Sequence, residues 1–223
     1  MREQEVEGPT ITSGMRAIHY VITRGISVAL DSARLYSRDE HAFDEMNEGY
    51  ADYVHTLSSV LNAHHLAEDE VAFPFLATLL PDAPFDTLSA AHRVMEPLIL
   101  WLDVAGDMLR SGEVDVLNEM SHVLVNLDDM WHPHIELEEE SFSDENLRDL
   151  MTSRDNAEIL QKTGEHNQKN AGPDYLVLPF LLYNLEPPER ARFARQLPSM
   201  IVDKLVPVDW KDKWSRMRPF LLE

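Results

Sequence analysis

Cysteine is missing from this chain of 223 residues, and glycine is scarce, with eight residues. Without thiolates the chain cannot form disulfides, iron–sulfur clusters, thiolate zinc sites or a cysteine nucleophile. No stretch reaches the roughly 18 consecutive apolar residues of a membrane span. The N-terminus, MREQEVEGPT, has no apolar signal region. We therefore expect a cytoplasmic protein without membrane contact.

Basic residues are also few. The chain has 19 Lys and Arg against 40 Asp and Glu, which gives a net charge of −21. A surface this acidic repels nucleic acid and anionic lipids, so neither is an expected partner. Part of the acidic excess can instead serve as metal ligand, because a buried cluster of acids without a counter-charge is costly.

Helix-forming residues dominate the composition, and long β-branched alternating runs are absent. Short turn-like breaks fall at Ser37-Arg38-Asp39, at Pro81-Asp82-Ala83-Pro84 and at Ser111-Gly112. Such short connections are typical of antiparallel neighbours in an up-down-up-down bundle. The sequence thus predicts four long helices, near 11–37, 41–79, 84–111 and 113–149.

The expected fold class is therefore all-α, with a four-helix bundle over 11–150 and a helical extension over 151–223. The last 50 residues are interrupted by six prolines, so the helices there should be shorter. We expect this extension to pack on the bundle.

Each of the four predicted long helices carries a metal-ligand residue type on its apolar stripe. Three of them carry a His–Glu pair four residues apart, which places both side chains on one face about one turn apart. His65 directly follows His64 and would point away by about 100°, either to the surface or to a position behind the ligands. The candidate ligands are His19, His64, Glu68, His92, Glu96, His134 and Glu138.

Imidazole with carboxylate suits iron, manganese or zinc. A single core histidine is more often hydrogen-bonded than metal-bound, and a single His–Glu pair is usually a surface pair. Four helices that match in register are much rarer by chance. Four histidines and three glutamates are too many for one ion and suit two.

These residues resemble the hemerythrin-like, or HHE cation-binding, family over about 14–145. The resemblance rests on His19, on His64-His65-Leu66-Ala67-Glu68, on Ala91-His92 and on His134-Ile135-Glu136-Leu137-Glu138-Glu139. It implies a non-heme centre of two Fe ions with oxo or hydroxo and carboxylate bridges. By that resemblance His19, His64, His92 and His134 would be terminal ligands, and Glu68 and Glu138 would bridge.

The sequence departs from the family's oxygen carriers at Glu96, where they place a second histidine. Glu139 is a further ambiguity, because it lies five residues after His134, as the carriers' carboxylate does. Additional carboxylate favours the ferric state, so the departure favours chemistry with oxygen, hydrogen peroxide or nitric oxide over reversible carriage.

Three functions remain open on the sequence: redox reactivity toward these small molecules, oxidation of a small organic substrate, and iron binding without turnover. A narrow apolar channel to the metal would favour the first, and a pocket lined by the extension would favour the second. A site closed by Glu96 and Glu139 would favour the third. An oligomer is compatible with each.

Overall fold

A computed structural model describes residues 9–222 of the chain, and every regular element in that range is helical. The all-α fold class predicted from the sequence is confirmed. Most of the N-terminal segment on which the cytoplasmic expectation rests lies outside the described residues. Within 9–222 no helix has both the length and the apolar character needed to cross a membrane.

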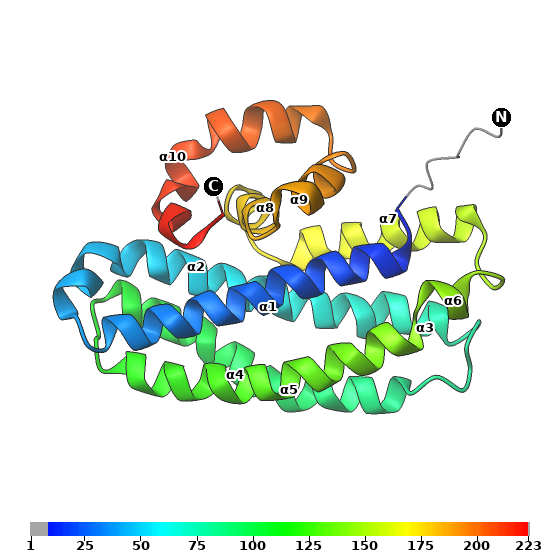
Figure 1. The fold of residues 1–223 in the computed structure, drawn as a ribbon, viewed down its shortest axis with the longest axis horizontal. Coiled ribbons are helices and arrows are strands. Elements are labelled where there is room, and N and C mark those ends of the chain that lie inside the picture. Colours follow the sequence, from blue (N-terminus) through cyan, green and yellow to red (C-terminus); the bar gives the residue numbers. More distant parts are fainter. Residues whose placement is uncertain (1–8, 223) are drawn as a thin grey trace.

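The bundle consists of four long helices that run alongside one another (Figure 1). They are α1 (Ile11–Tyr36), α2 (Glu40–Ala67), α4 (Phe85–Arg110) and α5 (Val116–Ser141). The most extensive packing is between α2 and α4 and between α1 and α5. Thr10 begins α1 with a capping box, in which its side chain accepts from Ser13 N and Ser13 pairs back with the Thr10 backbone.

The second helix continues beyond α2 through a π-helical turn, η1 (Glu68–Ala72), into the short α3 (Phe73–Leu76). In the π turn the Phe73 N–H donates to the Glu68 carbonyl, five residues back. Pro74 lacks an N–H, which prevents the regular helical bond at this point. Such turns often occur at functional sites, and this one begins at a predicted metal ligand.

The fourth helix is shorter than the predicted 113–149, because α5 ends at Ser141. Ser143 is extended, and its side chain accepts from Asn146 N, which starts the separate helix α6 (Asp144–Leu147). A serine in this position is a preferred N-cap, so a new helix begins where the apolar pattern had suggested continuation.

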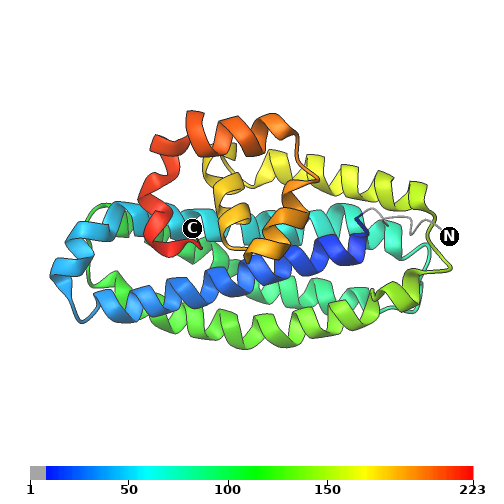
Figure 2. The ribbon, with the colours of Figure 1, turned by 45° about the horizontal axis from the view of Figure 1, so that its top comes forward.

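The extension lies along one side of the bundle, over α1 and α2 (Figures 1 and 2). Its elements are α7 (Ser153–Asn170), α8 (Asp174–Tyr183), α9 (Pro187–Ala194), η2 (Ile201–Asp209), α10 (Lys211–Trp214) and η3 (Ser215–Phe220). Phe180 and Phe220 are buried against Tyr53 of α2, with ring centroids 5.0 and 5.4 Å away. Bundle and extension thus share one hydrophobic core.

Close approach of the extension depends on Gly49 of α2. A Cβ at this position would lie 2.1 Å from the carbonyl oxygen of Arg216 in η3. No other residue type fits without moving the backbone of η3, so Gly49 allows the last helical segment to pack on the bundle.

Candidate metal centre

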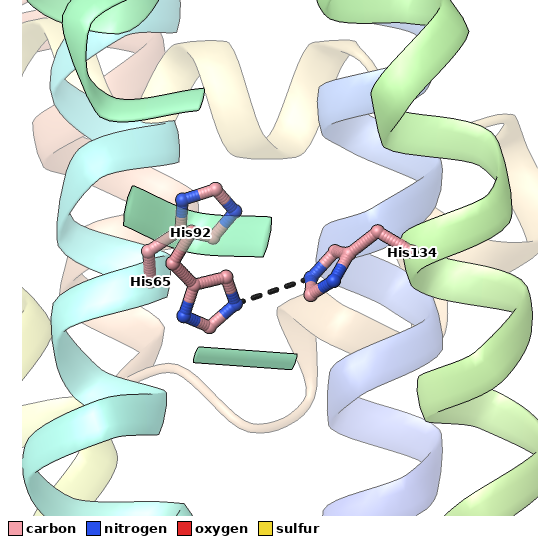
Figure 3. A group of neighbouring side chains, drawn as sticks. All are labelled: His65, His92 and His134. Atoms are coloured by element: carbon pink, nitrogen blue, oxygen red, sulfur yellow. Dashed lines mark hydrogen bonds between the residues drawn. The ribbon is translucent and has the colours of Figure 1, made fainter. Parts of the chain in front are cut away.

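The bundle interior contains two neighbouring clusters of buried metal-ligand side chains. In each cluster the ligand atoms lie within 4.8 Å of one another. The His19 cluster consists of His19, His64, Glu68 and Glu138, and the His65 cluster consists of His65, His92 and His134 (Figure 3). Six of the seven residues predicted from the sequence are brought together here.

The structure buries His65 within a cluster of ligand side chains, against the expectation that it would lie at the surface or behind the ligands. Helix α2 is covered by α1, α4, α7 and α8, so a 100° step along it does not lead to solvent. The His64 ring faces His19 with ring centroids 5.1 Å apart, whereas the His65 ring stacks on His92 at 4.0 Å and 14°. Two consecutive residues thus serve two clusters.

Glu96 is exposed and belongs to neither cluster, which corrects its assignment as a candidate ligand. Helical geometry explains the difference. The buried stripe of α4 passes from His92 to Met95 and then to Ile99, and a residue directly after Met95 is turned by about 100° from the core. The expected carboxylate-rich site, with its shift toward the ferric state, is therefore not what the bundle contains: the clusters hold five histidines and two glutamates.

Glu68 and Glu138 lie between the two clusters. Glu68 approaches His64 Nε2 with one oxygen at 3.2 Å and His92 Nε2 with the other at 3.4 Å. Glu138 Oε2 lies 3.3 Å from His19 Nε2 and 3.7 Å from His134 Nε2. Each carboxylate thus faces histidines of both clusters, as a bridge between two ions requires.

A carboxylate next in sequence to each of these glutamates orients a histidine. Asp69 Oδ2 pairs with His92 Nδ1 at 3.0 Å, and Glu139 Oε1 pairs with His19 Nδ1 at 2.9 Å. Arg16 Nε lies 3.4 Å from the second Glu139 oxygen. Because each carboxylate accepts a hydrogen bond from Nδ1–H, Nε2 of both rings remains available for the interior, which is the usual way that proteins orient metal-binding histidines. Glu139 is thus an orienting partner outside both clusters.

Several buried polar atoms of the site have no hydrogen-bond partner among the described residues. They are His19 Nε2, His64 Nε2, His65 Nε2, His134 Nδ1, Glu68 Oε2 and Glu138 Oε2. Buried polar groups are nearly always satisfied, because leaving one unsatisfied costs about 1–3 kcal/mol. All but His134 Nδ1 are nitrogen or oxygen donors that bound metal ions would satisfy, so the donor set fits two cations.

The protonation of the site agrees with this fit. Burial, together with neighbouring imidazoles, lowers the pKa of His64 and of His65 well below the usual range, so both are neutral at pH 7. Neutral imidazole is the form that binds metals. Burial and the nearby Glu138 raise the pKa of Glu68 well above its ordinary value. A cation between the two carboxylates would remove this conflict.

An apolar cavity of about 570 Å³ borders the His19 cluster through His64, Glu68 and Glu138. Helices α1 and α2 form one wall, and α7, α8 and the segment that follows α9 form the other. No residue of the His65 cluster lines this cavity. The extension thus encloses a space beside one half of the site only.

Sequence reasoning missed His65 and the orienting role of Asp69 and Glu139. A signal for the two carboxylates was present, because each directly follows the glutamate of a His–Glu pair. No comparable signal marked His65, whose counterpart after His134 is Ile135.

Residues 10–145 match the model of the family described as hemerythrin HHE cation binding domain. The match covers more than half of the chain and all seven residues of the two clusters. The comparisons with curated proteins and with solved structures gave no match.

Proposed function

This chain belongs to the hemerythrin HHE cation-binding domain family, and from that premise we propose that it holds two iron ions and reacts with oxygen, hydrogen peroxide or nitric oxide. The observation that carries the proposal is the set of seven buried ligand side chains, five atoms of which have no hydrogen-bond partner among the described residues. His19 and His64 would hold one ion, and His65, His92 and His134 would hold the other. Glu68 and Glu138 would bridge them.

Iron in this position would supply electron-transfer chemistry toward small oxidants. The protein's own contribution is to orient the imidazoles through Asp69 and Glu139 and to bury the site. The His19 cluster has one histidine fewer than its neighbour, and it is the one that borders the cavity. A small molecule that enters through the cavity would therefore reach the ion that has fewer histidine ligands.

Metal analysis of the purified full-length protein tests the first part of this proposal. We expect about two metal ions per chain, mostly iron. The variant His64→Ala should lose metal and about 3–5 kcal/mol of unfolding free energy, because it leaves buried carboxylates unpaired. One zinc ion per chain, or full iron in His64→Ala with an unchanged melting curve, would exclude the assignment.

Optical spectra of the ferrous protein mixed with oxygen, peroxide or nitric oxide test the second part. A reversible oxygen band would indicate carriage, and gas evolution from peroxide would indicate catalase-like turnover. If the protein shows neither of these responses, that result would favour the alternative function, oxidation of a small organic molecule. The cavity walled by the extension supports this alternative.

A further inference from the structure

The cavity between bundle and extension has the size and lining of a binding site for an organic molecule. Its volume of about 570 Å³ lies within the range of roughly 300–1,000 Å³ typical of small-molecule sites. Its lining is mainly apolar and comes from both walls, with Ile18 and Val21 on α1 and Leu178 and Leu181 on α8. These surfaces favour a hydrocarbon occupant.

Charge restricts the occupant further. Among the described residues that line the cavity there is no Lys or Arg, whereas Glu68, Glu138 and Asp174 are present. Without bound metal, an anionic head group would therefore meet carboxylates and no cationic side chain. Glu68 and Glu138 already lie 3.2 and 3.3 Å from site histidines and would hold the metal ions, and the apolar walls would desolvate a cationic head group. An uncharged molecule meets neither cost.

One polar side chain on the cavity wall has unused hydrogen-bonding capacity. Asn167 Oδ1 is buried and has no hydrogen-bond partner within residues 9–222. The lining hydroxyls differ, because Thr12 donates to the Phe142 carbonyl and Thr163 donates to the carbonyls of Ile159 and Leu160. A ligand hydroxyl can donate to the Asn167 amide oxygen and so satisfy it.

We propose that this cavity binds an uncharged, mainly hydrocarbon molecule that carries a hydroxyl group, with the hydroxyl at Asn167. The proposal rests on the proposed function only in placing this molecule beside the metal ions; binding itself requires apolar walls and the amide. Gly164 and Gln168 line the cavity one turn apart on α7, and both are exposed.

Gly164 offers a variant that narrows the cavity without disturbing the fold. A Cβ at Gly164 would meet no atom within 4 Å, and Gly164 is not among the glycines with positive φ. A leucine here should extend into the part of the cavity that Gly164 lines, and it should stabilise α7 because glycine is a poor helix former. Arg154→Leu is the matched control, since Arg154 is exposed on the same helix and does not line the cavity.

The test is calorimetric titration of the iron-loaded full chain with 1-decanol, and of the metal-depleted full chain with 1-decanol, decanoate and decylamine, with metal content measured in each sample. We expect one decanol per chain and binding of both charged molecules weaker by about tenfold or more. Gly164→Leu should weaken decanol binding by about tenfold or more, while Arg154→Leu leaves it unchanged. Asn167→Leu should weaken decanol binding, because it removes the acceptor for the hydroxyl.

No decanol binding by wild type, equal binding of decanoate, or an unchanged affinity in Gly164→Leu would overturn the inference. These outcomes are separable from failure of the metal assignment. Two iron ions without decanol binding leave the proposed function intact, and decanol binding by a protein without metal leaves the cavity assignment intact.

Discussion

The His19 cluster and the His65 cluster together draw on two copies of one sequence pattern, a histidine, a glutamate four residues later and an acid directly after it. His64, Glu68 and Asp69 form one copy, and His134, Glu138 and Glu139 form the other. The two acids cross over, because Asp69 orients His92 and Glu139 orients His19. The bundle therefore has an approximate internal symmetry around its metal ligands.

The surroundings of the clusters differ more than their frameworks do. His65 adds a third histidine on one side, where the matching position of the other copy is Ile135. Phe73 stacks on His92 at 5.6 Å and 15°, which covers the His65 cluster. The His19 cluster lacks the additional histidine and borders the cavity. One half is thus suited to holding an ion, and the other to admitting a second molecule.

Removal of His65 is expected to have the largest effect on this comparison. His65→Ala should reduce metal content from about two ions per chain toward one, because the His65 cluster loses one of its three nitrogen donors. Glu96→Ala, the matched control, should keep both ions, since Glu96 is exposed and outside the clusters. Metal analysis after gel filtration measures both.

The opposite result would reverse the assignment of these two residues. Full metal in His65→Ala, together with loss in Glu96→Ala, would mean that the side chains exchange places when metal binds.

Acid should weaken the metal-depleted protein through the His65 cluster. Burial lowers the pKa of His134 to about 4, against about 6.5 in an unfolded chain. Between these values the unfolded state binds a proton that the folded state does not. The free energy of unfolding should therefore fall as pH drops from about 6.5 to 4, by roughly 3 kcal/mol from this residue.

Urea denaturation of the metal-depleted protein at pH 7, 5.5 and 4 measures this dependence. His134→Gln should lose less stability over the interval than wild type, because glutamine does not titrate. His132→Gln should follow wild type, since His132 is exposed. If the free energy of unfolding fell equally with pH in wild type and in His134→Gln, His134 would not be held neutral by burial.

The sequence predicted the fold and most of the site, because both follow from one apolar stripe per helix. His19, His64, His92 and His134 could be placed in this way since each stripe faces the same interior. The same reasoning misplaced Glu96. Residues three and four positions after His92 can both lie on the same face of the helix as His92, and Met95 occupies the inward position. This reasoning also missed His65, because burial of α2 on a further face depends on how α4 and the extension pack. The cavity is a product of that packing as well.

Loss of a single orienting carboxylate should have the smallest effect and should distinguish the halves. Asp69→Asn weakens the hydrogen bond that orients His92, and Glu139→Gln weakens the hydrogen bond that orients His19. Each should lower the affinity for one ion by about 10–100-fold, the usual range for such partners. In chelator competition with iron, each variant should shift one of two binding steps, and the double variant should shift both.

Glu140→Gln is the control, because Glu140 is exposed and next in sequence to Glu139. Its two steps should coincide with those of wild type. If Asp69→Asn and Glu139→Gln shifted the same step, the carboxylates would act on a single ion, and the division into two clusters would not hold. Shifts in different steps would instead assign each step to its cluster. The step moved by Glu139→Gln would then identify the ion that borders the cavity, since His64, Glu68 and Glu138 of the His19 cluster line it.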